Sequence, residues 1–521
     1  MSRMDQSKST WPLTAMLLLS ASLVGCGGRE GVPPPMKEQA TLVSGPSPFP
    51  AGCQQASNPG TNYENAEVES WLAIDPNNSA HLVGIFQQDR WSNGGSHGLM
   101  TAVTRDSGAS WKLGFAHLSR CSGGNPSNGA DYERVSDPWV TFSPDGTVFQ
   151  SGLSFNASNA NQGTLVVRST DGGDTWTDPT TLMFDTDPTV SQDKDSITAD
   201  PTRAGFAYAI WSRYIFTDAS QRVLLSSPAW FSRTTDGGAT WAPPRLIYDP
   251  PPGFYALGHE IVGLPDGTLV DMFFQYDNTS SAFYTIRSSD QGLTWSQPTL
   301  IDTYQDIGIT DVKTGELVRG GVANIAVNPT TGTLYFVWMD ARFSGGLRDG
   351  IAFSTSTDGG MSWSPAVQVN QAPNVQAFAP VIAVTTSGRI AITYYDFRKD
   401  TSDPNVLLTN YWRITSGDGG TTWQEIPLSS SFDLRTAPKT GLGYMVTDYE
   451  GLVASGGSFV SFFVTANSGN TANPTDVFAT SAEKGIGGNT STNGHIEVNF
   501  HPLTVKEQMQ LRRERRPPIE P

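Results

Sequence analysis

An eight-residue pattern occurs six times along the chain and constrains its fold more than any other feature. In Thr234–Trp241 it reads as a hydroxyl residue, any residue, Asp, any residue, Gly, any residue, Ser or Thr, and Trp. The six aspartates, which lie 54 to 68 residues apart, are Asp106, Asp171, Asp236, Asp290, Asp358 and Asp418. A motif that recurs at such a period indicates a repeat architecture in which each period is one structural unit.

This pattern resembles the Asp-box, or BNR repeat, of the sialidase superfamily of β-propellers. The resemblance implies that each copy is a turn between the third and fourth strands of a blade, on the face away from an active site. Glycine permits positive φ angles, the aspartate accepts backbone N–H bonds, and the tryptophan buries apolar area. We therefore expect the six aspartates to stabilise the scaffold and not to react.

The segments between the boxes predict the rest of each blade. Gly 53, Pro 35 and 10% aromatic residues suit many short strands joined by tight turns. A hairpin signal such as Ser143–Gly146 or Leu264–Gly267 precedes each box, which gives four strands per repeat. A seventh hairpin, 449–465, follows the last box and has no box of its own. We predict an all-β propeller over 63–484 with seven four-stranded blades and six Asp-boxes; six blades is the alternative.

The closing strand of the seventh hairpin has two candidate sources. One is the segment 495–500, within a C-terminal tail that we place at 485–521. The other is the N-terminal segment before Trp71. The sequence does not decide between these two sources of the closing strand.

The N-terminus has the features of an export signal. Arg3 and Lys8 precede a short apolar run, and Leu23-Val24-Gly25-Cys26 resembles a bacterial lipobox. The resemblance implies a signal peptide over 1–26, lipidation of Cys26 and a flexible tether over 27–62. Gly27 follows the cysteine, which favours the outer membrane or cell surface of a bacterial envelope. An ordinary secretory signal is the alternative.

Two cysteines remain after Cys26. Cys53 precedes the repeats and Cys121 follows the first box. In an exported chain this pair is a candidate disulfide, which would join the tether to the first blade.

Polar residues gather on the face opposite the boxes, where second strands end and where blades are linked. The linkers are 131–137, 192–195, 259–260, 316–319 and 448–450. The sialidase resemblance implies arginines that bind a carboxylate, a tyrosine nucleophile assisted by a glutamate, and an aspartic acid. The candidate arginines are Arg90, Arg134, Arg342 and Arg398. The candidates for the acid are Asp89, Asp137 and Asp195, and those for the nucleophile pair are Tyr449 with Glu260 or Glu450.

Two observations keep other interpretations open. The Phe/Tyr-Arg-Ile/Leu-Pro motif of sialidases is absent, so no catalytic residue is transferred by motif. Asp340-Ala341-Arg342 and Asp396-Phe397-Arg398 also suit local ion pairs.

The leading hypothesis is an exported propeller that acts on glycans, as a glycoside hydrolase of exo-sialidase type. The alternatives are a non-catalytic propeller that binds a glycan or protein, and a scaffold or assembly lipoprotein. The net charge of −17 argues against nucleic acid as a partner. The six histidines show no metal-ligand spacing, and we expect no cofactor. Asp193 and Asp195 could hold Ca²⁺, but the rest of a calcium-loop signature is absent. We expect a monomer that contacts the membrane only through its lipid anchor.

Overall fold

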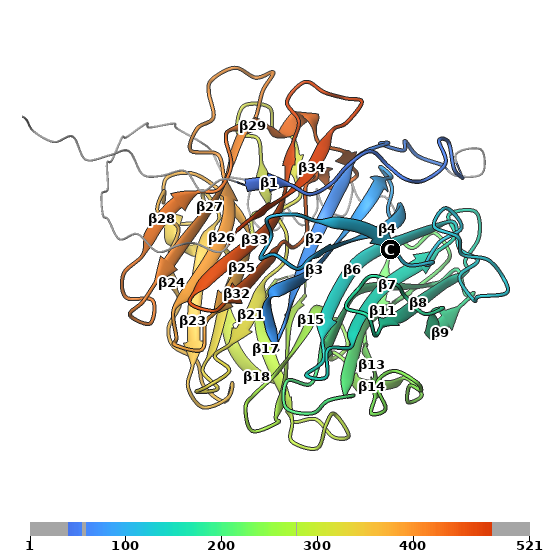
Figure 1. Cartoon of the computed structure of the whole chain (residues 1–521). Coiled ribbons are helices and arrows are strands. Elements are labelled where there is room, and N and C mark those ends of the chain that lie inside the picture. Colours follow the sequence, from blue (N-terminus) through green and yellow to red (C-terminus); the bar gives the residue numbers. More distant parts are fainter. Residues whose placement is uncertain (1–39, 55–58, 278, 482–521) are drawn as a thin grey trace, which may run out of the picture. The chain divides into compact units, whose positions relative to one another are not determined.

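Antiparallel sheets of short strands make up nearly all of the folded chain (Figure 1). The computed structural model describes residues 40–54, 59–277 and 279–481, all within the unit Lys37–Pro521. In these ranges the helical elements are the 3₁₀ turns η1 (Arg342–Ser344) and η2 (Leu434–Thr436), and none is long and apolar enough to cross a membrane. The predicted signal peptide, Cys26 and the tail 485–521 lie outside the described residues.

The strands group into seven units of four. Unit 1 contains β2 Glu67–Asp75, β3 Asn78–Arg90, β4 Ser96–Thr104 and β5 Lys112–Phe115. Unit 2 contains β6 Arg134–Phe142, β7 Val148–Phe155, β8 Gln162–Ser169 and β9 Thr180–Asp185. Unit 3 contains β10 Val190–Ala199, β11 Ala207–Phe216, β13 Ala229–Thr234 and β14 Arg245–Tyr248, with β12 Leu224–Ser226 added to β11.

The second half of the chain repeats this pattern. Unit 4 contains β15 Tyr255–Gly263, β16 Leu269–Tyr276, β17 Ser281–Ser288 and β18 Thr299–Thr303. Unit 5 contains β21 Asn324–Val327, β22 Leu334–Asp340, β23 Gly350–Ser356 and β24 Val367–Gln368. Unit 6 contains β25 Ala377–Val384, β26 Ile390–Asp396, β27 Leu408–Ser416 and β28 Gln424–Pro427, with β29 Phe432–Asp433 added to β27. Unit 7 contains β32 Gly451–Ser455, β33 Ser458–Ala466, β34 Thr475–Thr480 and β1 Ala40–Leu42.

The first strands of the units contact one another in a closed series. β2 lies beside β6, and the series continues through β10, β15, β21 and β25 to β32, which contacts β2 again. This is the strand arrangement of a β-propeller, with the first strands innermost.

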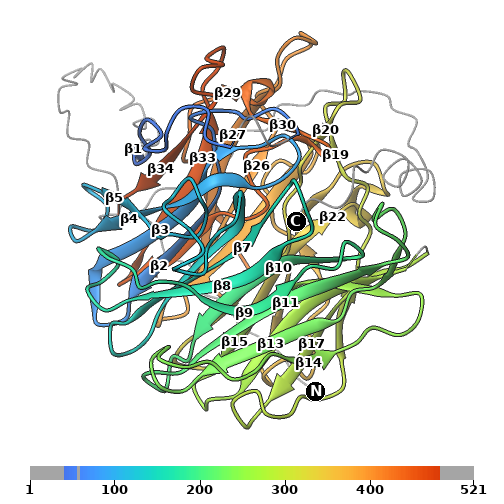
Figure 2. The same cartoon turned by 90° about the vertical axis from the view of Figure 1, so that its right-hand side faces the viewer.

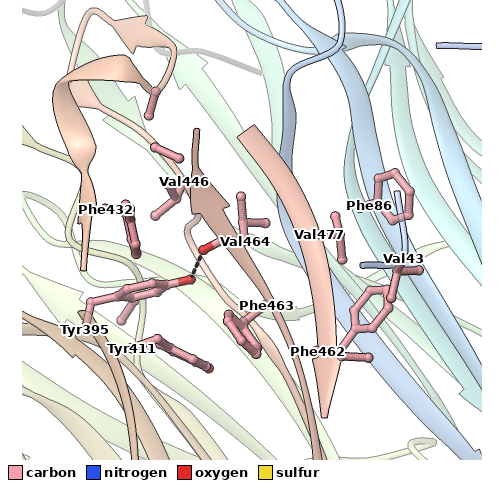
Figure 3. Packing of buried hydrophobic residues seen from close by; sticks show 14 of the residues in the cluster. Val43, Phe86, Tyr395, Tyr411, Phe432, Val446, Phe462, Phe463, Val464 and Val477 are labelled. Carbon is pink, nitrogen blue, oxygen red and sulfur yellow. Dashed lines mark hydrogen bonds between the residues drawn. The ribbon is translucent and has the colours of Figure 1, made fainter. Parts of the chain in front are cut away.

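The N-terminal segment closes unit 7. β1 pairs with β34, so that the blue strand lies beside the orange-red one in Figure 1. Of the two sources open for the closing strand, the N-terminal segment is therefore the one that pairs, and 495–500 lies outside the described residues. Phe49 is buried and Val43 packs with Phe86 and Phe462 in one core cluster (Figure 3). Residues 40–54 thus belong to the folded unit and correct the prediction of a tether through 62.

Cys53 and Cys121 form a disulfide. It joins this N-terminal segment to the loop that follows β5. The segment is therefore held at both ends, by β1 and by the disulfide.

The six Asp-box turns are alike in their hydrogen bonds. In the third copy, Gly238 N donates to Thr234 Oγ1 at 2.9 Å and Thr240 N donates to Asp236 Oδ1 at 2.9 Å. Gly237 and Gly238 have φ angles of 71° and 78°, which glycine adopts without strain. Arg168 of the preceding unit donates to Gly237 O at 2.6 Å, so the turn also ties two units together.

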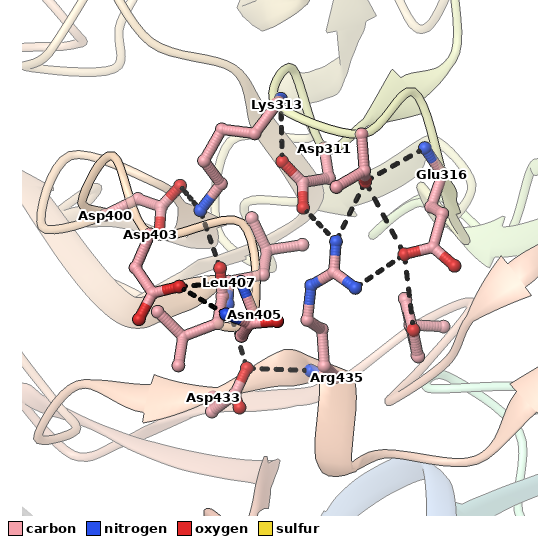
Figure 4. A network of polar contacts seen from close by, with 12 residues as sticks. Asp311, Lys313, Glu316, Asp400, Asp403, Asn405, Leu407, Asp433 and Arg435 are labelled. Atoms are coloured by element: carbon pink, nitrogen blue, oxygen red, sulfur yellow. Dashed lines mark hydrogen bonds and ion pairs between the residues drawn. The ribbon is translucent and has the colours of Figure 1, made fainter.

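A small separate sheet lies at one side of the first strands. It contains β19 Ile309–Thr310, β20 Leu317–Val318, β31 Gly443–Tyr444 and β30 Lys439–Thr440. We call it the cover sheet, and Figure 2 shows β19, β20 and β30 together at the upper edge. Arg435 binds Asp311 at 2.6 Å and Glu316 at 2.6 Å within the polar network beside this sheet (Figure 4). Two linkers, between units 4 and 5 and between units 6 and 7, therefore build it jointly.

Candidate active site at the centre of the propeller

Bulges near the starts of the first strands direct side chains to the centre. The register shifts in β2, β6, β10, β15 and β25. The extra residue of each bulge has a positive φ; these residues are Glu69, Asp137, Lys194, Gly258 and Ala379. A bulge bends its strand and re-aims a side chain, so equivalent positions of neighbouring units converge.

Lys194 is surrounded by three carboxyl groups. Its Nζ lies 2.5 Å from Asp448 Oδ2, 3.5 Å from Asp137 Oδ2 and 3.9 Å from Asp193 Oδ1. Burial opposes its charge, but these carboxylates outweigh burial and hold the pKa of Lys194 well above its usual value. The lysine therefore stays protonated across the physiological range.

Arg319 reaches the same carboxylate from the cover sheet. Its Nε and Nη2 each lie 2.5 Å from an oxygen of Asp448, a two-point contact. Although burial acts in the opposite direction, Arg319 and Lys194 lower the pKa of Asp448 well below its usual value. Asp448 is thus a fixed negative charge between two cations.

Glu69 is the fully buried carboxyl of this group. Gln87 Nε2 donates to one of its oxygens, and Arg319 Nη2 lies 4.0 Å from the other. Burial, with Asp137 and Asp448 adding to it, raises the pKa of Glu69 to about 8. Glu69 is therefore mainly protonated at neutral pH.

Asp193 and Asp195 have the same tendency. Burial raises the pKa of Asp193 to about 7 and that of Asp195 well above its usual value, and Asp137 adds to both. A side-chain hydrogen bond from Ser151 opposes this rise for Asp195. We call Glu69, Asp137, Asp193, Lys194, Asp195, Arg319, Asp448 and Tyr449 the central cluster.

Aromatic rings lie against this cluster. Trp71 stacks on Trp139 with ring centroids 3.7 Å apart, and Tyr449 meets Trp139 edge-on at 5.2 Å. The Tyr449 hydroxyl is buried without a hydrogen-bond partner among the described residues. Burial, and then Glu69 and Asp137, raise the pKa of Tyr449 well above its usual value. This tyrosine consequently keeps its proton and can donate a hydrogen bond.

The cluster borders a small pocket, which we call the central pocket. Its wall comes from units 2 to 6 and from Tyr449; the lining residues are Trp139, Lys194, Asp195, Gly258, His259, Glu260, Val322, Ala323, Asn324, Pro380 and Tyr449. The pocket thus combines an apolar aromatic side with ionisable groups.

Glu260 is a second carboxyl with a raised pKa in the pocket wall. It accepts hydrogen bonds from Asn324 Nδ2 at 3.0 Å and from Ile325 N at 3.4 Å. Burial raises its pKa to about 8, against the effect of these bonds. Its contacts link unit 4 to unit 5.

The four candidate arginines each have different partners. Arg134 donates to Gly94 O at 2.7 Å and lies over the Trp91 ring at 4.3 Å, and Arg90 donates to Gln87 at 2.8 Å. Arg342 binds Asp340 at 2.7 Å and Asp302 on β18 at 3.0 Å.

Arg398 completes the set. It binds Asp396 at 2.6 Å and Glu425 on β28 at 2.5 Å, and it lies 3.8 Å above Trp412. Since β18 and β28 are the fourth strands of their units, Arg342 and Arg398 reach outward, and the arginines are not brought to one site.

The predicted catalytic residues fall into two groups, those that lie at the centre and those that do not. Asp137, Asp195, Glu260 and Tyr449 are brought to the centre. Asp89 accepts from His97 Nδ1 at 2.9 Å and from Asn65 N at 2.8 Å, so it orders the N-terminal segment. Glu450 accepts from Ser70 and Tyr395 and is buried.

Sequence reasoning assigned no role to four residues of the cluster. Lys194, Arg319 and Asp448 lie in linkers that the sequence analysis identified as polar. The polar composition of these linkers was the signal by which the three residues could have been chosen as site candidates. Glu69 lies between Val68 and Ser70 inside a strand, where no turn residue marks the bulge. The carboxyl that most affects Tyr449 is Glu69, not Glu260 or Glu450.

No group of three or more His, Cys, Asp or Glu side chains suited to a metal ion occurs in the described part of the chain. The central cluster instead balances its carboxylates with Lys194 and Arg319.

The fold is that of a β-propeller, and six of its turns have the Asp-box pattern. Residues 228–437 match the family described as a BNR repeat-like domain, which confirms the resemblance of the repeats. No curated protein matches the sequence.

Solved structures with a similar arrangement come from several sources. The Hadza microbial sialidase Hz136 is 16% identical, with a TM-score of 0.45, over 77% of this chain and 73% of that one. A protein of unknown function from Dyadobacter fermentans is 14% identical, with a TM-score of 0.44, over 86% and 99%. The Penicillium chrysogenum α-L-arabinanase, in complex with arabinobiose, is 15% identical, with a TM-score of 0.40, over 68% and 96%.

Proposed function

We propose that this protein hydrolyses glycosidic bonds with two carboxyl groups of the central cluster, Glu69 and Asp137. Glu69 and Asp137 occupy equivalent bulge positions on the neighbouring strands β2 and β6. Gln87 Nε2 donates to Glu69 and, at 3.2 Å, to Ser136 Oγ, which donates to Asp137 Oδ1 at 2.7 Å. This shared hydrogen-bond network is the observation that carries the proposal.

The two carboxyls suit different roles. Glu69, with its pKa of about 8, carries a proton at neutral pH and can give it to the glycosidic oxygen as the bond to the sugar breaks. Asp137, whose Oδ2 lies 3.5 Å from Lys194 Nζ, is the candidate base for water or nucleophile. Tyr449, whose pKa is raised, is a hydrogen-bond donor beside them and a poor phenolate nucleophile.

The test is hydrolysis of a panel of 4-methylumbelliferyl glycosides. Glu69→Gln should lower kcat by about 10² to 10⁴, and much less for dinitrophenyl glycosides, whose leaving group needs no acid. Wild-type kcat/KM should fall as pH rises through about 8, where Glu69 loses its proton, and Glu69→Gln should lack this limb. Glu425→Gln, on β28, is the matched control and should keep the wild-type rate. Full turnover by Glu69→Gln would refute the assignment.

A second candidate is a propeller that binds a glycan without cleaving it. The supporting observation is that Glu69 and Asp137 are only 0% and 2% exposed, beneath the contacts of Arg319 and Asp448. Glycan binding by the wild type with no turnover of any substrate would favour this function.

We also propose that the protein works as a lipid-anchored monomer at the bacterial cell envelope, on a glycan ligand. The lipobox-like Leu23-Val24-Gly25-Cys26 supports the anchor, and the Cys53–Cys121 disulfide suits an oxidising compartment. Cell fractionation of wild type and Cys26→Ala tests it: the wild type should sediment with membranes and the variant should not.

A further inference from the structure

We infer that Gln87 is a positioning residue, which keeps the proton of Glu69 on Oε1 and so determines the oxygen from which the acid gives it. This inference rests on the proposed function and adds to it the residue and the atom that control the proton transfer. The observation behind it is the direction of the hydrogen bonds around the Gln87 amide, a fully buried group on β3.

The orientation of the Gln87 amide is fixed from both of its ends. Arg90 Nη1, which can only donate, lies 2.8 Å from Gln87 Oε1, so this atom is the oxygen that accepts. On the other side, Gln87 Nε2 lies 3.2 Å from Ser136 Oγ, which donates its own hydrogen to Asp137 Oδ1 at 2.7 Å. A flipped amide would place two donors together at Arg90 and two acceptors together at Ser136.

This orientation decides which oxygen of Glu69 can be protonated. Gln87 Nε2 donates to Glu69 Oε2. A protonated carboxyl group has one oxygen that carries the hydrogen and one that only accepts. Because the amide N–H cannot accept, Oε2 is the accepting oxygen. Since its pKa of about 8 keeps Glu69 mainly protonated at neutral pH, the proton lies on Oε1.

Oε1 is also the oxygen of Glu69 that other side chains leave available. Within the described part of the chain, Glu69 Oε1 has no hydrogen-bond partner. Arg319 Nη2 lies 4.0 Å from it, beyond hydrogen-bond distance, and donates to Asp448 Oδ2 at 2.5 Å. The proton on Oε1 is therefore not shared with another described group.

The same contact assists the proton transfer. When Glu69 acts as the acid, the O–H bond at Oε1 breaks and its hydrogen goes to the glycosidic oxygen, which leaves as an alcohol. The electron pair of that O–H bond stays on Glu69 as the negative charge of the carboxylate and spreads over Oε2. Gln87 Nε2–H already points at Oε2, and a donor that is in place before the reaction favours the charged product.

The direct test is neutron diffraction from crystals of the whole wild-type chain in heavy water at about pH 6, where Glu69 is protonated. Deuterium should lie on Glu69 Oε1 and on Gln87 Nε2, and not on Glu69 Oε2. Deuterium on Oε2, an unprotonated Glu69 or a flipped Gln87 amide would overturn the inference. The measurement needs neither a variant nor a substrate, so it does not depend on hydrolysis.

Kinetics test the positioning role. Gln87→Met removes the amide but keeps the length of the side chain, so kcat for a 4-methylumbelliferyl glycoside should fall about tenfold or more, with KM within about twofold. For a dinitrophenyl glycoside, whose leaving group needs no acid, kcat should change by less than about twofold. A merely structural defect would slow both substrates. Gln88→Met is the matched control, since Gln88 is also buried and donates to Glu67 Oε1 at 2.6 Å, and it should keep the wild-type rate on both.

The inference and the proposed function fail in different ways. Hydrolysis that depends on Glu69 but is unchanged in Gln87→Met, or an equal loss on both substrates, keeps the proposed function and overturns the positioning role. Deuterium on Oε1 in a protein that hydrolyses no glycoside supports the assignment of the proton and contradicts the proposed hydrolysis.

Discussion

The Asp-box turns and the first-strand bulges use acidic residues in opposite ways. In a box, Asp236 accepts from Thr240 N and Thr240 Oγ1, four residues away, and these bonds lower its pKa to about 2. In a bulge, burial raises the pKa of Glu69 to about 8. The first environment is built by one short segment, and the second by strands from several units.

This contrast separates scaffold from chemistry. The six boxes repeat the same contacts, so none is distinguished from the others. The bulge positions repeat only in backbone shape and hold different residues: Glu69, Asp137, Lys194, Gly258 and Ala379. In this repeated fold the candidate site therefore lies at equivalent backbone positions that hold a different side chain in each unit.

The largest effect on stability should come from Lys194→Met. The variant leaves Asp137, Asp193 and Asp448 buried around an apolar side chain, so the free energy of unfolding should fall by about 3 to 5 kcal/mol. Urea unfolding at pH 7 measures it. Lys112→Met removes an exposed ion pair with Asp174 and should cost less than about 1 kcal/mol. Equal losses of unfolding free energy in the two variants would contradict the difference between the buried central cluster and the exposed surface pair.

A smaller effect is expected from Asp171→Ala in a box. Asp171 accepts from Thr175 N at 2.9 Å and from Thr175 Oγ1 at 2.5 Å, and the loss should be about 1 kcal/mol because the turn is exposed. The folded pKa of Asp171, about 2, lies below its unfolded value. Its contribution is therefore present at neutral pH and is lost as pH falls through 2. Thermal unfolding of both proteins at pH 7 and pH 2 should show the difference shrinking; a constant difference would contradict this.

An effect of opposite sign should come from Glu260→Gln. The folded pKa of Glu260, about 8, lies above its unfolded value, so its contribution to stability is lost as pH rises toward and through 8. The variant should therefore melt near the wild-type temperature at pH 5 and a few degrees higher at pH 9. Glu64→Gln, at an exposed position, should show no such pH dependence. A lower melting temperature of Glu260→Gln at pH 9 would show that Glu260 is not buried as described.

Sequence reasoning predicted what is built locally. The hydrogen bonds of an Asp-box join residues at most four positions apart, so the eight-residue sequence pattern was enough to predict the turns. Tyr449 and Asp137 were found because they lie in polar linkers, and unit closure by the N-terminal segment was one of two stated alternatives.

The remaining features depend on residues far apart in the chain. Glu69 and Lys194 adopt positive φ without being glycine, which only the strand register reveals. The sequence analysis counted Arg342 and Arg398 as candidates for ligand binding, but each forms an ion pair with the aspartate two residues earlier in the chain. The pairing of Arg319 with Asp448 joins two linkers 129 residues apart, which no local pattern encodes.

The central claim is that chemistry belongs to the bulges and not to the boxes. The most direct measurement is kcat/KM at pH 7 for Asp137→Asn and Asp171→Asn, on the 4-methylumbelliferyl glycoside that the wild type hydrolyses fastest. Asp137→Asn should lose at least about 10²-fold, and Asp171→Asn should stay within about twofold of the wild type, since its turn lies outside the site. Full activity in Asp137→Asn, or an equal loss in Asp171→Asn, would contradict the claim.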